Sequence, residues 1–148
     1  MTVNIDITKE LKAVEKLIKS DINKEKTILG LYNYIFKSDG KKIRSRLNLI
    51  ASSSSKNSDR YKLASIIELL HTATLVHDDV VDNASTRRGA ISVNSLWSNA
   101  HGVLIGDYIY SKAFMLMVEI GKKLFPDLLP IKISLNIIGS PIKTMHNK

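Results

Sequence analysis

The chain of 148 residues contains no cysteine, and only 6% of its residues are aromatic. Without thiols it can form neither a disulfide framework nor a thiolate metal site. No apolar run reaches about 18 residues, the length of a membrane span. Residues 1–10 have no apolar core of signal-peptide length, and Asp6 and Glu10 do not suit an arginine-rich transit peptide. We therefore expect a cytoplasmic protein with a hydrophobic core and no transmembrane segment.

Proline is absent from the first 125 residues, and all three prolines, Pro126, Pro130 and Pro141, follow that point. Proline interrupts helices, so the front of the chain is free to be helical and the end is not. No stretch before residue 125 alternates with the period of two that a half-buried strand requires. The 3.6-residue period of amphipathic or buried helices appears in four segments, 8–20, 41–51, 61–83 and 101–122. The pattern predicts an all-α fold, an antiparallel helix bundle with an irregular proline-containing tail.

The net charge of +8 is unevenly distributed. Residues 122–148 contain five lysines against Asp127 alone, so they carry half of the excess. The front of the chain is only mildly basic and holds a carboxylate cluster that a phosphate backbone would avoid. A small basic nucleic-acid-binding protein is therefore the weakest hypothesis, and we expect no nucleic acid as a partner.

The most informative segment is 77–89, where three carboxylates precede two adjacent arginines. On a helix, Asp78 and Asp82 share one face about 6 Å apart, and Asp79 is turned about 100° away. Such a pair suits Mg²⁺, which completes its shell with waters and phosphate oxygens. Arg87 and Arg88 follow where the helix should end, and each guanidinium matches phosphate oxygens bidentately. The segment therefore resembles a diphosphate site.

A second basic pair, Lys41 and Arg44 at the start of an earlier helix, could meet the helix that carries the aspartates. His71 lies two turns before Asp78 and shares its face. Two clusters would suit two anionic substrates better than one. Each part also has an ordinary structural explanation: a solvated acidic face, a hydrogen-bonded core histidine and a solvated basic face.

Five short motifs in order carry a resemblance to a known family. They are Gly40-Lys41-Lys42-Ile43-Arg44, Glu68-Leu69-Leu70-His71, Asp78-Asp79-Val80-Val81-Asp82, Arg87-Arg88-Gly89 and Gly106-Asp107-Tyr108. Together they resemble the trans-isoprenyl diphosphate synthases, or polyprenyl synthetases, and most of all the bacterial long-chain, octaprenyl-type members. Any one motif alone would be a weak signal, but five in the right order are a strong one.

The resemblance implies the front half of an isoprenoid-synthase-type fold and a Mg²⁺-dependent prenyltransferase that condenses isopentenyl diphosphate head-to-tail with an allylic diphosphate, as in quinone side-chain biosynthesis. It implies Mg²⁺ on Asp78 and Asp82, with Asp79 in a supporting catalytic position. It also implies the allylic diphosphate on Arg87. Small Ala73 and Thr74 would leave room for a long product. The isopentenyl diphosphate ligands that it implies are Lys41, Arg44, His71 and Arg88.

Some positions depart from the family pattern. Asp39 and Ser45 stand where the family usually has glycine and proline, and no second aspartate-rich motif follows Asp82. We therefore expect a truncated family domain over residues 1–125 and a non-family tail over 126–148. The alternative hypothesis is a catalytically inactive remnant, or a non-catalytic partner subunit, that retains partial Mg²⁺ and diphosphate binding. A homodimer, or a dimer with a full-length homologue, is expected in either case.

Overall fold

The computed structural model describes residues 6–37, 40–55, 57–87 and 89–124. Within these ranges the chain is mostly helical, and a short antiparallel hairpin pairs Thr86 with Ile91 and Arg87 with Ala90. The predicted all-α fold is confirmed. The elements, in chain order, are α1 (Ile7–Lys19), α2 (Lys26–Ile35), α3 (Ile43–Ala51), α4 (Asp59–Val81), β1 (Thr86–Arg87), β2 (Ala90–Ile91), α5 (Val93–Leu96) and α6 (Asn99–Leu124).

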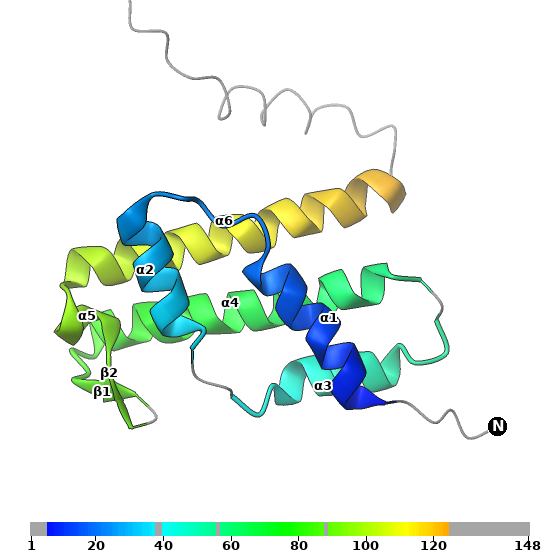
Figure 1. Cartoon of the computed structure of the whole chain (residues 1–148), viewed down its shortest axis with the longest axis horizontal. Coiled ribbons are helices and arrows are strands. Elements are labelled where there is room, and N and C mark those ends of the chain that lie inside the picture. Colours follow the sequence, from blue (N-terminus) through cyan, green and yellow to red (C-terminus); the bar gives the residue numbers. More distant parts are fainter. Residues whose placement is uncertain (1–5, 38–39, 56, 88, 125–148) are drawn as a thin grey trace, which may run out of the picture.

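The two longest helices, α4 and α6, run antiparallel and side by side through the middle of the molecule (Figure 1). Glycines let them approach closely. A Cβ atom on Gly102 would lie 2.5 Å from Cγ2 of Val80, and one on Gly106 would lie 2.2 Å from Nε2 of His77. Any larger side chain at Gly106 would therefore meet the imidazole ring.

Helix α1 packs on α4 and α3 through a buried stripe formed by Leu11, Val14 and Ile18. The 3.6-residue period brings these side chains onto one face, as the sequence predicts. The carboxylate of Asp6 accepts hydrogen bonds from the N–H groups of Thr8 and Lys9, both at 3.1 Å, and so begins the helix. Helix α1 thereby covers one side of α4.

Helix α2, which the periodicity did not predict, packs against α6. Its Tyr32 is fully buried and donates a hydrogen bond to the carbonyl of Ile18 at 2.6 Å. Burial raises the pKa of this phenol above its ordinary value, because the phenolate would lose its hydration. The ammonium of Lys112 on α6 donates to the carbonyl of Ser20 and lies over the Tyr32 ring. These contacts fix α2 relative to α1 and α6, and α2 lines one side of a cavity whose opposite side is α4.

In the part of the chain that the structure describes, no helix is both long enough and apolar enough to cross a membrane. The proposed tail, residues 126–148, lies outside the described residues. The domain boundary near residue 125 therefore stays a prediction.

Candidate active site

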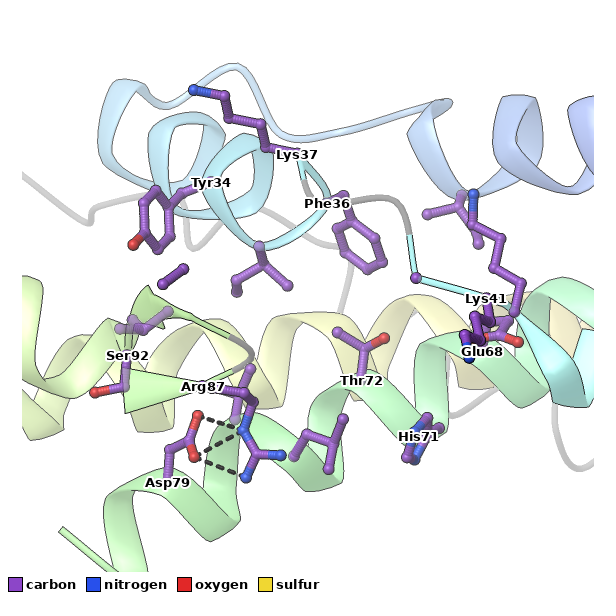
Figure 2. Close-up of a pocket in the computed structure, with 18 of the residues that line it drawn as sticks. Tyr34, Phe36, Lys37, Lys41, Glu68, His71, Thr72, Asp79, Arg87 and Ser92 are labelled. Carbon is purple, nitrogen blue, oxygen red and sulfur yellow. Dashed lines mark hydrogen bonds and ion pairs between the residues drawn. The ribbon is translucent and has the colours of Figure 1, made fainter. Parts of the chain in front are cut away.

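A cavity of about 850 Å³ lies between α2, the face of α4 below it and the β1–β2 hairpin (Figure 2). Its floor is one face of α4, with Glu68, His71, Thr72, Leu75 and Asp79 at spacings of three and four residues. Five cationic side chains line it against the two carboxylates of Glu68 and Asp79. A cavity of this charge favours an anionic ligand. The five cations are Lys37, Lys41, Lys42, Arg44 and Arg87.

Four of the predicted substrate-binding residues, Lys41, Arg44, His71 and Arg87, line this one cavity. They come from different elements: the loop before α3, the start of α3, the middle of α4, and β1. In Figure 2, Lys41 and His71 lie toward one end of the cavity and Arg87 toward the other. Arg88 lies outside the described residues. The cavity therefore has room for anions at two separate ends.

The guanidinium of Arg87 forms a fork-like ion pair with Asp79. Its Nε lies 2.8 Å from both carboxylate oxygens, and its Nη2 lies 2.7 Å from Oδ1. The hydrogen bond to Asp79 is the main reason why the pKa of Arg87 is raised, and the charges of Asp78 and Asp82 raise it further while burial lowers it. Asp79 is itself buried, with 5% of its surface exposed. The middle carboxylate of the motif is therefore engaged inside the protein.

Asp78 and Asp82, the predicted metal ligands, are both exposed and do not line the cavity. Asp82 caps the end of α4, and its N–H donates to the carbonyl of Asp78 at 2.8 Å. Among the described residues, no group of three or more histidine or acidic side chains could hold a metal ion. Two carboxylates one turn apart do fit Mg²⁺ that also binds substrate phosphate, because that ion usually takes only one or two carboxylates.

The basic loop before α3 is fixed to α4 by Ser45. The N–H of Ser45 donates to Oε1 of Glu68 at 3.1 Å, and its hydroxyl donates to the carbonyl of Ala64 at 3.0 Å. Just before it, Lys42 has left-handed backbone angles, with φ of 45°, and its ammonium pairs with Glu15 on α1. These contacts orient Lys41 and Arg44 at the cavity edge.

The hairpin that carries Arg87 is held by contacts that the sequence did not reveal. The hydroxyl of Tyr34 on α2 donates to the carbonyl of Ile91 at 2.8 Å, and its ring meets Trp97 edge-on. The carbonyl of Ala84 accepts hydrogen bonds from the side chains of Ser92 and Asn94 at 2.5 and 3.2 Å. Tyr34 has no recognisable local signal, because its partner lies 57 residues away.

Ala73 and Thr74 do not bound the cavity. Ala73 is fully buried in the core, and Thr74 is exposed and donates to the carbonyl of His71 at 2.7 Å. The predicted effect of these small residues on product length therefore finds no support in the shape of this cavity.

Comparisons with known proteins agree on one family. The family model described as polyprenyl synthetase matches residues 6–136. An all-trans-nonaprenyl-diphosphate synthase (geranyl-diphosphate specific) of Rhodobacter capsulatus is 36% identical over 118 residues, which is 77% of this chain and 36% of that protein. The octaprenyl diphosphate synthase of Escherichia coli is 34% identical, over 80% of this chain and 38% of its own length. The chain thus spans a little over a third of these relatives.

Solved structures give the same result. A decaprenyl diphosphate synthase from Rhodobacter capsulatus superposes with a TM-score of 0.74 at 34% identity, over 84% of this chain and 39% of that one. A polyprenyl synthase from Caulobacter crescentus, solved in complex with calcium and isoprenyl diphosphate, gives a TM-score of 0.71 at 35% identity, over 76% of this chain and 35% of its own. Both likenesses extend over more than three quarters of this chain.

Proposed function

This chain belongs to the polyprenyl synthetase family, and from that premise we propose that it is a polyprenyl diphosphate synthase. In this reaction the double bond of isopentenyl diphosphate attacks the allylic carbon, whose diphosphate leaves, and loss of one proton restores a double bond in a prenyl chain longer by five carbons. One observation above all supports it. The residues that the family motifs assign to two diphosphates, Lys41, Arg44, His71 and Arg87, line a single basic cavity.

The two ends of the cavity suit different substrates. Arg87, beside the aspartate motif, is the proposed ligand of the allylic diphosphate. Lys41, Arg44 and His71, at the other end, are the proposed ligands of isopentenyl diphosphate, together with Arg88. This assignment of the two ends fits the chemistry. The diphosphate group of the allylic substrate must leave its carbon, whereas that of isopentenyl diphosphate stays bonded to its carbon skeleton. Only the former needs strong stabilisation of a departing charge.

Asp78 and Asp82 are the proposed ligands of Mg²⁺. When bound, the ion would neutralise the diphosphate group that leaves the allylic carbon. The Caulobacter crescentus relative, solved with calcium and isoprenyl diphosphate, makes the pairing of a divalent cation with this class of ligand reasonable. Both carboxylates are exposed at the C-terminal end of α4, and Asp79 belongs to the same last part of the helix.

The remaining chemistry falls to the chain's own side chains. Departure of the diphosphate leaves an allylic cation, which water would destroy. Apolar lining residues such as Phe36, Leu75 and Val76 would exclude water from the reacting carbon. Arg87 would stabilise the charge that grows on the departing oxygen, since preorganised cations act most strongly away from water.

Incorporation of radiolabelled isopentenyl diphosphate into longer products, with purified protein, farnesyl diphosphate and Mg²⁺, tests the proposal. We expect Asp82→Ala to abolish incorporation and a chelator to do the same. The matched control is Glu119→Ala, which should be as active as the wild type, because the exposed Glu119 pairs with Lys62 near the start of α4 and does not line the cavity. No incorporation by the wild-type chain would contradict the proposed activity.

A further inference from the structure

The three carboxylates of the aspartate motif differ in burial and in partner. Asp78 and Asp82 are exposed, whereas Asp79 is 5% exposed and lines the cavity. Both oxygens of Asp79 are occupied by one guanidinium, that of Arg87. A second cation on Asp79 would lie against that guanidinium and be repelled by it. Asp79 is therefore poorly suited to bind a metal, although it belongs to the same motif as the proposed metal ligands.

The pair uses only one edge of the guanidinium. Arginine has five N–H donors arranged in a plane. Asp79 accepts from Nε and from one hydrogen of Nη2. The other edge, formed by Nη1 and the second hydrogen of Nη2, points away from Asp79 along the cavity (Figure 2). That edge has the two parallel donors that match two oxygens of a phosphate group.

We propose that Asp79 is a positioning residue, which holds Arg87 by its Nε edge so that the opposite edge faces the diphosphate. This inference rests on the proposed function, because it requires that an anion binds at this end of the cavity. Asp79 stays attached to Arg87 when the anion binds. The carboxylate therefore acts on the substrate through the arginine and touches neither the substrate nor the metal.

Two other roles predict different behaviour. If Asp79 only occupied Arg87 until a substrate displaced it, the ion pair would break on binding. If Asp79 only stabilised the hairpin, its loss would affect folding alone. The hairpin, however, is also held by Tyr34 on Ile91 and by Ser92 on Ala84, so it does not depend on this pair.

Calorimetric titration of the purified chain with inorganic diphosphate, without Mg²⁺, separates these roles by the sign of the effect. Simple electrostatics predicts that Asp79→Asn, which removes a negative charge beside an anion site, tightens binding. Positioning predicts the opposite, a loss of about tenfold, because the guanidinium is no longer aligned. Asp79→Glu, which restores the charge, should recover part of the affinity. Equal or tighter binding by Asp79→Asn would overturn the proposal.

The matched control is Asp59→Asn, at the other end of α4, where the carboxylate also pairs with a cation, Lys123, at 2.7 Å. Its diphosphate affinity should equal that of the wild type. In an Arg87→Lys background, Asp79→Asn should cause no further loss. A loss as large as in the wild-type background would show that Asp79 does not act through Arg87, and would overturn the proposal.

A spectroscopic measurement adds a readout that folding alone would not move. The Nε–H resonance of Arg87 should show hydrogen bonding to a carboxylate both before and after diphosphate is added. A shift to the position of a free arginine on binding would mean that the ion pair breaks, and the proposal would be wrong. The incorporation assay judges the proposed function separately. A wild-type chain that binds diphosphate but makes no product would refute only the activity, and one that binds no diphosphate would refute the positioning role.

Discussion

Ser45 stands where the family resemblance leads one to expect proline, and at the scale of single residues it shows how this chain accommodates the difference. Proline has no N–H, whereas Ser45 donates its N–H to Glu68 and its hydroxyl to the carbonyl of Ala64. Its side chain is fully buried. At position 45, where the family pattern has the rigid ring of a proline, this chain instead holds the basic loop with two hydrogen bonds.

We expect Ser45→Ala to lower the free energy of unfolding by about 1 kcal/mol, because the buried carbonyl of Ala64 loses the hydrogen bond that the Ser45 hydroxyl donates. Urea unfolding followed by circular dichroism measures the change. Ser111→Ala is the control, since Ser111 makes a similar bond, to the carbonyl of Asp107 at 2.9 Å, but is exposed. Equal losses in both variants would contradict the role assigned to burial.

Lys112 makes a pH-dependent contribution to stability. Burial lowers the pKa of Lys112 from its usual value of 10.5, and the negative charge of Asp21 offsets part of that decrease. Between the lowered pKa of the folded chain and the ordinary pKa of the unfolded chain, the unfolded chain binds more protons, so this contribution rises with pH. We therefore expect the stability of the wild type relative to Lys112→Met to increase as the pH rises toward the ordinary lysine pKa of 10.5. Parallel pH profiles of the two proteins would rule this out.

At the scale of elements, the long helices could be predicted and the short elements could not. The periodic segments 8–20, 41–51, 61–83 and 101–122 correspond to α1, α3, α4 and α6, with ends displaced by about two residues, as is usual for helix boundaries. Helix α2 was missed. The strands β1 and β2 have two residues each, too few for any alternation to be visible.

The same difference of scale applies to the site. The basic and acidic residues could be named from their motifs, and five of them, four basic residues and Asp79, line the cavity. The sequence could not show that Asp79 faces Arg87, because that contact depends on a hairpin folding back over the end of α4. Nor could it show the contribution of Tyr34, which reaches Ile91 from a helix that was not predicted.

The close contact of α4 and α6 predicts opposite effects for two glycine substitutions in α6. Gly106→Ala would bring a methyl group within 2.2 Å of the His77 ring and should destabilise the fold by about 2 kcal/mol. Gly121→Ala meets nothing within 4 Å and should stabilise the helix by about 0.5 kcal/mol or more. Thermal unfolding of the two variants measures both. A harmless Gly106→Ala would mean that the helices separate easily.

The hairpin and α2 should be coupled through one hydroxyl group. Tyr34→Phe removes the hydrogen bond to Ile91 while the ring can still pack on Trp97. We expect diphosphate affinity to fall by about threefold, because the strand that carries Arg87 is held less firmly. Tyr110→Phe on α6 is the control, since Tyr110 does not line the cavity. Equal affinities in Tyr34→Phe and the wild type would show that the hairpin needs no support from α2.

At the scale of the whole molecule, α6 carries exposed apolar side chains along the described part of its length. Val103, Leu104, Phe114 and Met115 are each between 44% and 61% exposed. Groups of exposed apolar side chains often mark contacts with another protein chain. They make α6 the natural place for the dimer that the sequence leads us to expect.

Sedimentation analysis should therefore find self-association of the wild-type chain that is weakened by a Phe114→Ser, Met115→Ser double variant. Removing two exposed apolar side chains takes away area that association would bury. Leu47→Ser on α3, where the leucine is 62% exposed, is the control. If the α3 variant weakens association as much as the α6 variant, the contact does not involve α6 in particular.

The cavity also bears on the order in which the molecule is assembled. Among the described residues, those that line it all lie between Ile18 and Val93, so none of them belongs to α6. Chains are synthesised from the N-terminus, and their early parts can begin to fold before the later parts exist. A ribosome therefore synthesises the described walls of the cavity before it synthesises α6, which packs against α4. The described surface of the cavity is delivered first, and the helix that packs on another side of α4 is added afterwards.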